Sequence, residues 1–88
     1  MSADEDAIRT VLLTEINRRI IRFCKNPHTS AEIVNETTPA RTSDPGYYET
    51  LVSNALRILE NYGMISFADG KWVSSKISLQ ILDKYFGG

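Results

Sequence analysis

Residues 47–63 constrain the fold more than any other stretch, because their apolar positions recur at the spacing of a helix. On a helical wheel these positions fill one arc of roughly 160°. They are Tyr48, Leu51, Val52, Ala55, Leu56, Ile58, Leu59 and Tyr62. Asp44 and Pro45 mark the start of the helix as N-cap and first helical residue, and Gly63 marks its end in a left-handed conformation. The pattern predicts a half-buried helix over residues 45–62.

Two short apolar runs follow Gly63, over residues 64–68 and 71–74, and only Asp69 and Gly70 separate them. A two-residue turn between paired strands needs positive φ at both positions, which an Asp-Gly pair adopts readily. The runs therefore predict an antiparallel hairpin that turns at Asp69 and Gly70. In that register Phe67 faces Trp72 as an aromatic cross-strand pair.

Residues 53–65, with the sequence SNALRILENYGMI, resemble the recognition helix and wing entry of ArsR/MarR-like and archaeal winged-helix regulators. In those proteins a Ser-x-x-Leu-x-x-Leu run ends in a Gly that two apolar residues follow. Residues 17–34 are similar to the preceding helix pair, so the resemblance covers roughly two thirds of the chain. It implies a mainly α fold of the α+β class: a winged helix-turn-helix with a two-stranded hairpin wing and helices at both ends.

The chain has 88 residues, enough for one domain, and we expect a single winged-helix domain over residues 1–88. Its expected parts are an N-terminal helical region (3–25), a helix-turn-helix with a long turn (29–63), the wing (64–74) and a C-terminal helix (76–86). Ser74 and Ser75 can cap this last helix. The patterns thus predict three helices, a hairpin and a terminal helix.

The N-terminal region carries two apolar stripes that point in different directions. Ser2 and Glu5 have the spacing of a capping box, so we expect a helix to begin near Ala3. The stripe up to residue 12 and the stripe from residue 13 onward differ by about 100° on the wheel. Either the helix breaks near Thr14, or one long helix packs its first half on something other than its own core.

The second stripe is opposed by a charged face made of Glu15, Arg18, Arg19, Arg22 and Lys25. This face is either solvated, with Glu15 supporting the arginines at i+3 and i+4, or a surface that contacts phosphates. After Pro27, residues 29–32 form a capping box for the next short helix. The following stretch, 35–46, is longer than a tight turn, and it either extends the helix over 45–62 or forms its own loop.

The composition and motifs of the chain bear on whether it is an enzyme, a metal-binding protein or a membrane protein. With one His and one Cys, the sequence has no internal disulfide and no ligand cluster at metal-binding spacing. It also lacks a Gly-rich phosphate loop and a nucleophile motif, so we expect no enzyme activity, metal or cofactor. No apolar run approaches the ~18–20 residues of a membrane span, and the first residues are acidic where a secretory signal would be basic. We expect a cytoplasmic protein with no membrane partner.

The resemblance implies a small transcriptional regulator whose helix over 45–62 reads double-stranded DNA. Asn and Arg side chains bond base edges in the major groove, whereas Thr, Ser, Tyr and Lys reach phosphates. The candidate DNA-binding residues are Arg41, Thr42, Ser43, Tyr47, Thr50, Ser53, Asn54, Arg57 and Lys71. The alternative is that this polar arc is only a solvated face of a winged-helix protein-interaction module without specific DNA binding. The net charge of −1 and the short hairpin tip favour that alternative.

Apolar residues in the first helix and the terminal helix exceed what one small domain is expected to cover. The excess predicts a homodimer, because contiguous exposed apolar surface usually marks an interface and two-fold dimers are the commonest assemblies. The expected interface residues are Ile8, Val11, Leu12, Leu79, Leu82, Tyr85 and Phe86. Such a dimer would present two half-sites to DNA.

Overall fold

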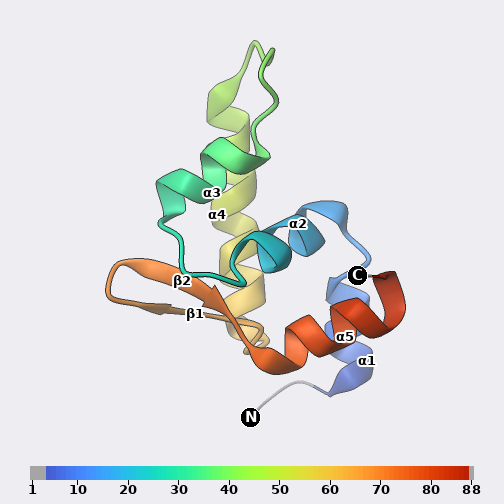
Figure 1. The fold of residues 1–88 in the computed structure, drawn as a ribbon. Coiled ribbons are helices and arrows are strands. Elements are labelled where there is room, and N and C mark those ends of the chain that lie inside the picture. Colours follow the sequence, from blue (N-terminus) through green and yellow to red (C-terminus); the bar gives the residue numbers. More distant parts are fainter. Residues whose placement is uncertain (1–3, 88) are drawn as a thin grey trace.

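Five helices and one antiparallel hairpin make up residues 4–87, which a computed structural model describes. In chain order they are α1 (Glu5–Val11), α2 (Glu15–Phe23), α3 (Ser30–Thr37), α4 (Pro45–Asn61), β1 (Ile65–Ala68), β2 (Lys71–Ser74) and α5 (Lys76–Phe86). Figure 1 shows α2 between two groups, with α3 and α4 on one side and α1 and α5 on the other. The mainly helical α+β class predicted from the sequence is confirmed.

The N-terminal region is broken into two helices, so four helices precede the hairpin where three were predicted. Thr14 occupies the N-cap position of α2, but its side chain makes no capping hydrogen bond. Instead, the end of α1 is satisfied from α2: Asn17 Nδ2 donates to Val11 O at 2.9 Å. A search for capping residues close in sequence does not find this donor, because it lies on α2, across the break.

Within the described residues the first helix begins at Glu5. Asp4 is its N-cap and accepts a hydrogen bond from the Ala7 N–H at 2.8 Å, so α1 starts at Glu5. The predicted start near Ala3 and the capping role of Ser2 lie outside the described residues.

The link between α3 and α4 is shorter than the sequence indicated. The capping box of Thr29 and Glu32 forms as predicted, but α3 continues to Thr37 and leaves residues 38–44 as a separate loop. Threonine hydroxyls explain the extension: Thr37 Oγ1 donates to Ile33 O at 3.0 Å, and Thr38 Oγ1 donates to Val34 O at 2.6 Å. Thr37 is buried, although its polarity suggested a loop residue.

The central helix and the hairpin follow the sequence closely. Asp44 accepts a hydrogen bond from the Tyr47 N–H at 3.2 Å, and Gly63 has the expected left-handed φ of 70°. Asp69 and Gly70 have φ values of 55° and 78°, as a two-residue turn of type I′ requires. The ring centroids of Phe67 and Trp72 lie 4.8 Å apart.

A third segment pairs with the hairpin. His28 lies in the link between α2 and α3 and forms an antiparallel bridge with Trp72, with N···O distances of 3.0 and 2.7 Å. Ser74, at the end of β2, donates from its hydroxyl to Ile21 O at 2.7 Å. These contacts fix the hairpin against the C-terminal end of α2.

The two apolar surfaces predicted to form a dimer cover each other within one chain, because the break after α1 lets α1 fold back onto α5. Ile8, Leu12 and Leu82 are at most 2% exposed, and so cannot also contact a second copy. Val11, Leu79 and Phe86 are half-buried against the same core. Tyr85 remains 39% exposed, but its hydroxyl donates to Glu5 at 2.8 Å.

Because Leu82 is buried within one chain, replacing it should lower the stability by the same amount at every protein concentration. Leu82→Ala should lower the free energy of unfolding by about 2–5 kcal/mol, because it leaves a cavity between α5 and the rest of the core. Chemical denaturation at two protein concentrations, tenfold apart, checks this. A loss that grows with protein concentration would instead place Leu82 in an intermolecular interface.

Because the Glu5 carboxylate contacts α5, we predict that the stability of the fold depends on pH. The hydrogen bond from Tyr85, and next the one from Lys84, lower the pKa of Glu5 below its ordinary value of 4.5. The stabilisation is therefore complete above pH 4.5 and is lost as the pH falls through the lowered pKa. Glu5→Gln should reduce the melting temperature at neutral pH, and the difference from wild type should shrink in acid.

Glu36→Gln is the control for Glu5→Gln, since the Glu36 carboxylate has no hydrogen-bonded or ion-paired partner among residues 4–87. This variant should melt like wild type at both pH values. Equal effects of the two substitutions would show that the Glu5 contact contributes nothing.

Candidate nucleic-acid interface

The nine candidate DNA-binding residues lie on three separate parts of the chain: the 38–44 link, the outer face of α4 and the hairpin tip, which points away from α4 in Figure 1. Eight are exposed. Thr42 is half-buried, and its hydroxyl accepts a hydrogen bond from the Asp44 N–H at 3.2 Å. The structure thus gives Thr42 a part in shaping the link before α4.

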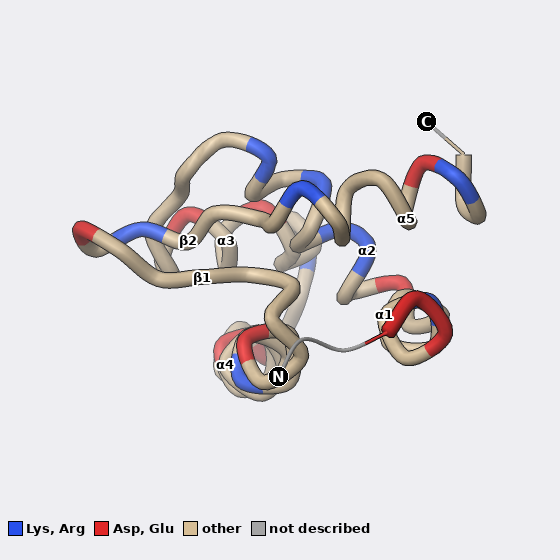
Figure 2. The backbone as a smooth tube through the Cα atoms, turned by 90° about the horizontal axis from the view of Figure 1, so that it is seen from below, with Lys and Arg blue, Asp and Glu red and all other residues tan. Residues whose placement is uncertain are grey.

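Helix α4 stands at one edge of the fold, and Figure 2 views it nearly along its axis. Val52, Ala55, Leu56 and Leu59 form its buried side. At 100° per residue, Thr50, Asn54 and Arg57 fall opposite that side, at the centre of the outer face. None of these three side chains has a hydrogen-bond partner within residues 4–87. The outer face is therefore free to contact a ligand.

The acidic residues of α4 lie off this outer face. Glu49 and Glu60 fall about 90° from its centre on the helical wheel, on the side toward α3 and the hairpin. Asp44 caps the N-terminus, and the first turn of α4 carries no other acid. A phosphate or base edge that meets Thr50, Asn54 and Arg57 head-on therefore meets no carboxylate there.

The cations divide into two groups. The three arginines of α2 are used within the chain: Arg18 donates to Leu12 O at 2.7 Å, Arg19 to Glu36 O at 2.9 Å and Arg22 to Phe86 O at 3.4 Å. The ion pairs expected between Glu15 and these arginines do not form within the described residues. Arg41, Arg57 and Lys71 have no partner within residues 4–87, so these three are among the available cations.

The N-terminus of α3 is occupied by its own carboxylate. Glu32 Oε1 accepts from the Thr29 N–H at 2.8 Å, and this backbone hydrogen bond is the main cause of the lowered pKa of Glu32. A helix N-terminus can bind a phosphate through its free N–H groups. Here the carboxylate of the capping box already fills that position, so phosphate binding is not expected at α3.

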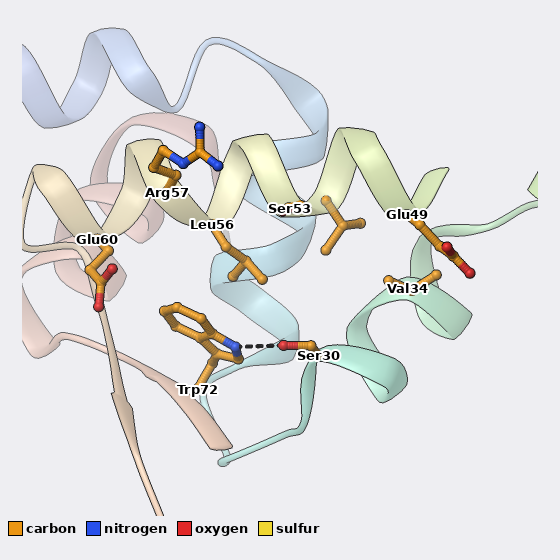
Figure 3. A pocket seen from close by; sticks show the side chains of 9 residues that line it. Ser30, Val34, Glu49, Ser53, Leu56, Arg57, Glu60 and Trp72 are labelled. Atoms are coloured by element: carbon orange, nitrogen blue, oxygen red, sulfur yellow. Dashed lines mark hydrogen bonds between the residues drawn. The ribbon is translucent and has the colours of Figure 1, made fainter. Parts of the chain in front are cut away.

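A cleft of about 300 Å³ lies between α4, α3 and β2, and sequence reasoning missed it. Trp72 forms one wall, and its Nε1 donates to Ser30 Oγ at 2.9 Å (Figure 3). We call this hollow the Trp72 cleft; its other walls come from Val34, Glu49, Val52, Ser53, Leu56, Arg57 and Glu60. In Figure 3 the Arg57 guanidinium extends on the side of α4 remote from Trp72. No local sequence pattern joins Ser30 to Trp72, because they are 42 residues apart.

The one cysteine and the one histidine of the chain both pack against other residues. Burial raises the pKa of the Cys24 thiol to about 11, so the thiolate is scarce at neutral pH. The His28 ring stacks on Phe23 with centroids 3.9 Å apart. Within residues 4–87 no three His, Cys, Asp or Glu side chains are grouped to hold a metal ion. None of the described helices combines the length and apolar character that crossing a membrane requires.

The resemblance to winged-helix regulators rests on residues 53–65 and on the order of the elements around them. The comparisons with known proteins add nothing to it. No protein-family model, no curated protein and no solved structure matches this chain.

Proposed function

We propose that this protein is a winged-helix domain that binds double-stranded DNA through the outer face of α4. The observation that carries the proposal is the set of Thr50, Asn54 and Arg57, which are exposed and have no partner among residues 4–87, on a face free of acids. The N-terminal end of α4 extends past the body of the fold in Figure 1. A projecting helix end with polar side chains suits insertion into a major groove.

The available charges support contact with phosphates next to such a groove. Arg41 precedes α4 in the 38–44 link, and Lys71 opens β2 beside the hairpin tip. The positive end of the α4 dipole adds to Arg41 at the projecting end. In this arrangement Arg57 and Asn54 contact base edges, while Arg41 and Lys71 contact the backbone.

The affinity of one copy should be modest. Residues 30–74, which contain α3, α4 and the hairpin, hold six acidic and three basic residues. With at most three phosphates neutralised, the slope of log K against log salt is expected to be about −3 or shallower.

A winged-helix protein-interaction module is the second candidate function. The excess of acids in residues 30–74 and the Trp72 cleft favour it, because a half-buried indole beside carboxylates in a cleft suits a basic protein segment. This candidate predicts no salt-dependent affinity for DNA. A titration of mixed-sequence duplex at two salt concentrations therefore separates the two functions.

The roles of Arg41 and Lys71 predict a uniform loss of DNA affinity. Arg41→Ala or Lys71→Ala should weaken binding to all duplexes alike and reduce the salt slope by about 1, since each removes one phosphate contact. Fluorescence anisotropy over a series of salt concentrations measures both quantities. Lys76→Ala, which removes an exposed cation from α5, is the control and should leave the slope unchanged.

The position of Arg57 predicts that replacing it lowers the affinity for some DNA sequences more than for others. Arg57→Ala should cost about 1–3 kcal/mol on the best duplex and relax the preference at one base pair, because a bidentate contact to a guanine is lost. Selection from a random duplex library, with wild type and variant in parallel, tests this. Unchanged binding by Arg57→Ala would reduce the outer face of α4 to a solvated surface.

A further inference from the structure

The side of α4 opposite the Trp72 cleft carries an unusual amount of exposed apolar surface. We call it the α4 flank, and it consists of Tyr47, Leu51, Ile58 and Tyr62. Tyr47 is 56% exposed, Ile58 44% and Tyr62 40%, and Leu51 is half-buried. Burial of α4 comes from α2, α3 and β1, which leaves these side chains uncovered.

The α4 flank is also free of charge. On the helical wheel it lies between the buried side and the outer face, and no Asp, Glu, Lys or Arg falls within its arc. The exposed parts of its side chains amount to roughly 300 Å² per copy, given 150–250 Å² for a whole aromatic side chain. Patches of this size on a small protein are often functional.

The order of residues along the flank is the same from either end. Successive members are four, seven and four residues apart, with tyrosines at the two ends and aliphatic residues inside. The midpoint of this spacing falls between Asn54 and Ala55, and between Leu51 and Ile58 no other side chain falls within the arc of the flank. Such a stripe is complementary to its own copy when the two helices run antiparallel.

We propose that a second copy of this chain packs on the α4 flank as an antiparallel, two-fold helix pair. Tyr47 of one copy then lies against Tyr62 of the other, and Leu51 lies against Ile58. Every apolar member of the flank meets an apolar member, which is the requirement of an isologous interface. A partner of another kind would not require this symmetry of spacing.

The size of the flank sets the strength of the pair. Two copies contribute roughly 600 Å² of apolar surface, and the polar rim brings the interface only to the low end of specific ones. The association is therefore weak and reversible.

Sedimentation equilibrium of the full chain without DNA tests the pair. Wild type should associate with concentration, and Ile58→Glu should weaken the association at least tenfold. Ile77→Glu is the matched control, because Ile77 is an isoleucine of similar exposure (48%) on α5. It should associate like wild type. A monomeric wild type at millimolar concentration, or equal effects of the two substitutions, would overturn the proposal.

A second experiment tests whether the two helices of the proposed pair run antiparallel. Leu51→Lys alone should also abolish association, but an equimolar mixture with Ile58→Glu should restore a heterodimer, because the two introduced charges then face each other. A parallel pair gives no such rescue, and its absence would overturn the arrangement. Circular dichroism confirms that each variant is folded. Because no DNA is present, this result is independent of the DNA-binding proposal.

Discussion

The arginines of α2 connect this helix to the ends of three other helices. Arg18 donates to the carbonyls at the end of α1, Arg19 to the end of α3 and Arg22 to the end of α5. Each bond satisfies a carbonyl that a helix C-terminus leaves without an intrahelical partner. A cation placed there also meets the negative end of the helix dipole. The charged face of α2 thus orients the helices around it, and α1 and α5 are brought together on one side.

The elements that were predicted correctly are those whose signals are local. Asp44, Gly63 and the Asp69-Gly70 turn act within a few residues of themselves, so the bounds of α4 and the hairpin could be derived from sequence. The link before α4 was mistaken because Thr37 and Thr38 bond backwards to helix carbonyls instead of leaving the helix. Helix α1 packs on α5 because the chain breaks between α1 and α2. The side chains that donate hydrogen bonds to the end of α1 lie on α2, across this break. Sequence periodicity showed two apolar surfaces but not that they meet.

The candidate DNA-binding interface was likewise predictable only where its signals are local. Helical periodicity was sufficient to place Thr50, Asn54 and Arg57 on one exposed face. It could not distinguish them from the arginines of α2, which looked equally available and are in fact occupied by backbone carbonyls. The Trp72 cleft depends on the bridge between His28 and Trp72, which joins segments far apart in the sequence. Availability, more than residue type, separates the cations that can meet DNA from those that support the fold.

Helix α4 has a buried side, an outer face and the α4 flank, and the roles proposed for the last two compete. Tyr47 belongs both to the face proposed for DNA and to the α4 flank. In an antiparallel pair the two α4 axes lie about 8–10 Å apart, whereas half-sites on successive major grooves are about 34–36 Å apart. A pair joined at the flank therefore cannot insert both helices into DNA, and binding of DNA by α4 favours the separated copies. Because the flank is small, the proposed pair is weak, so in this scheme protein concentration decides between pairing and the proposed DNA binding.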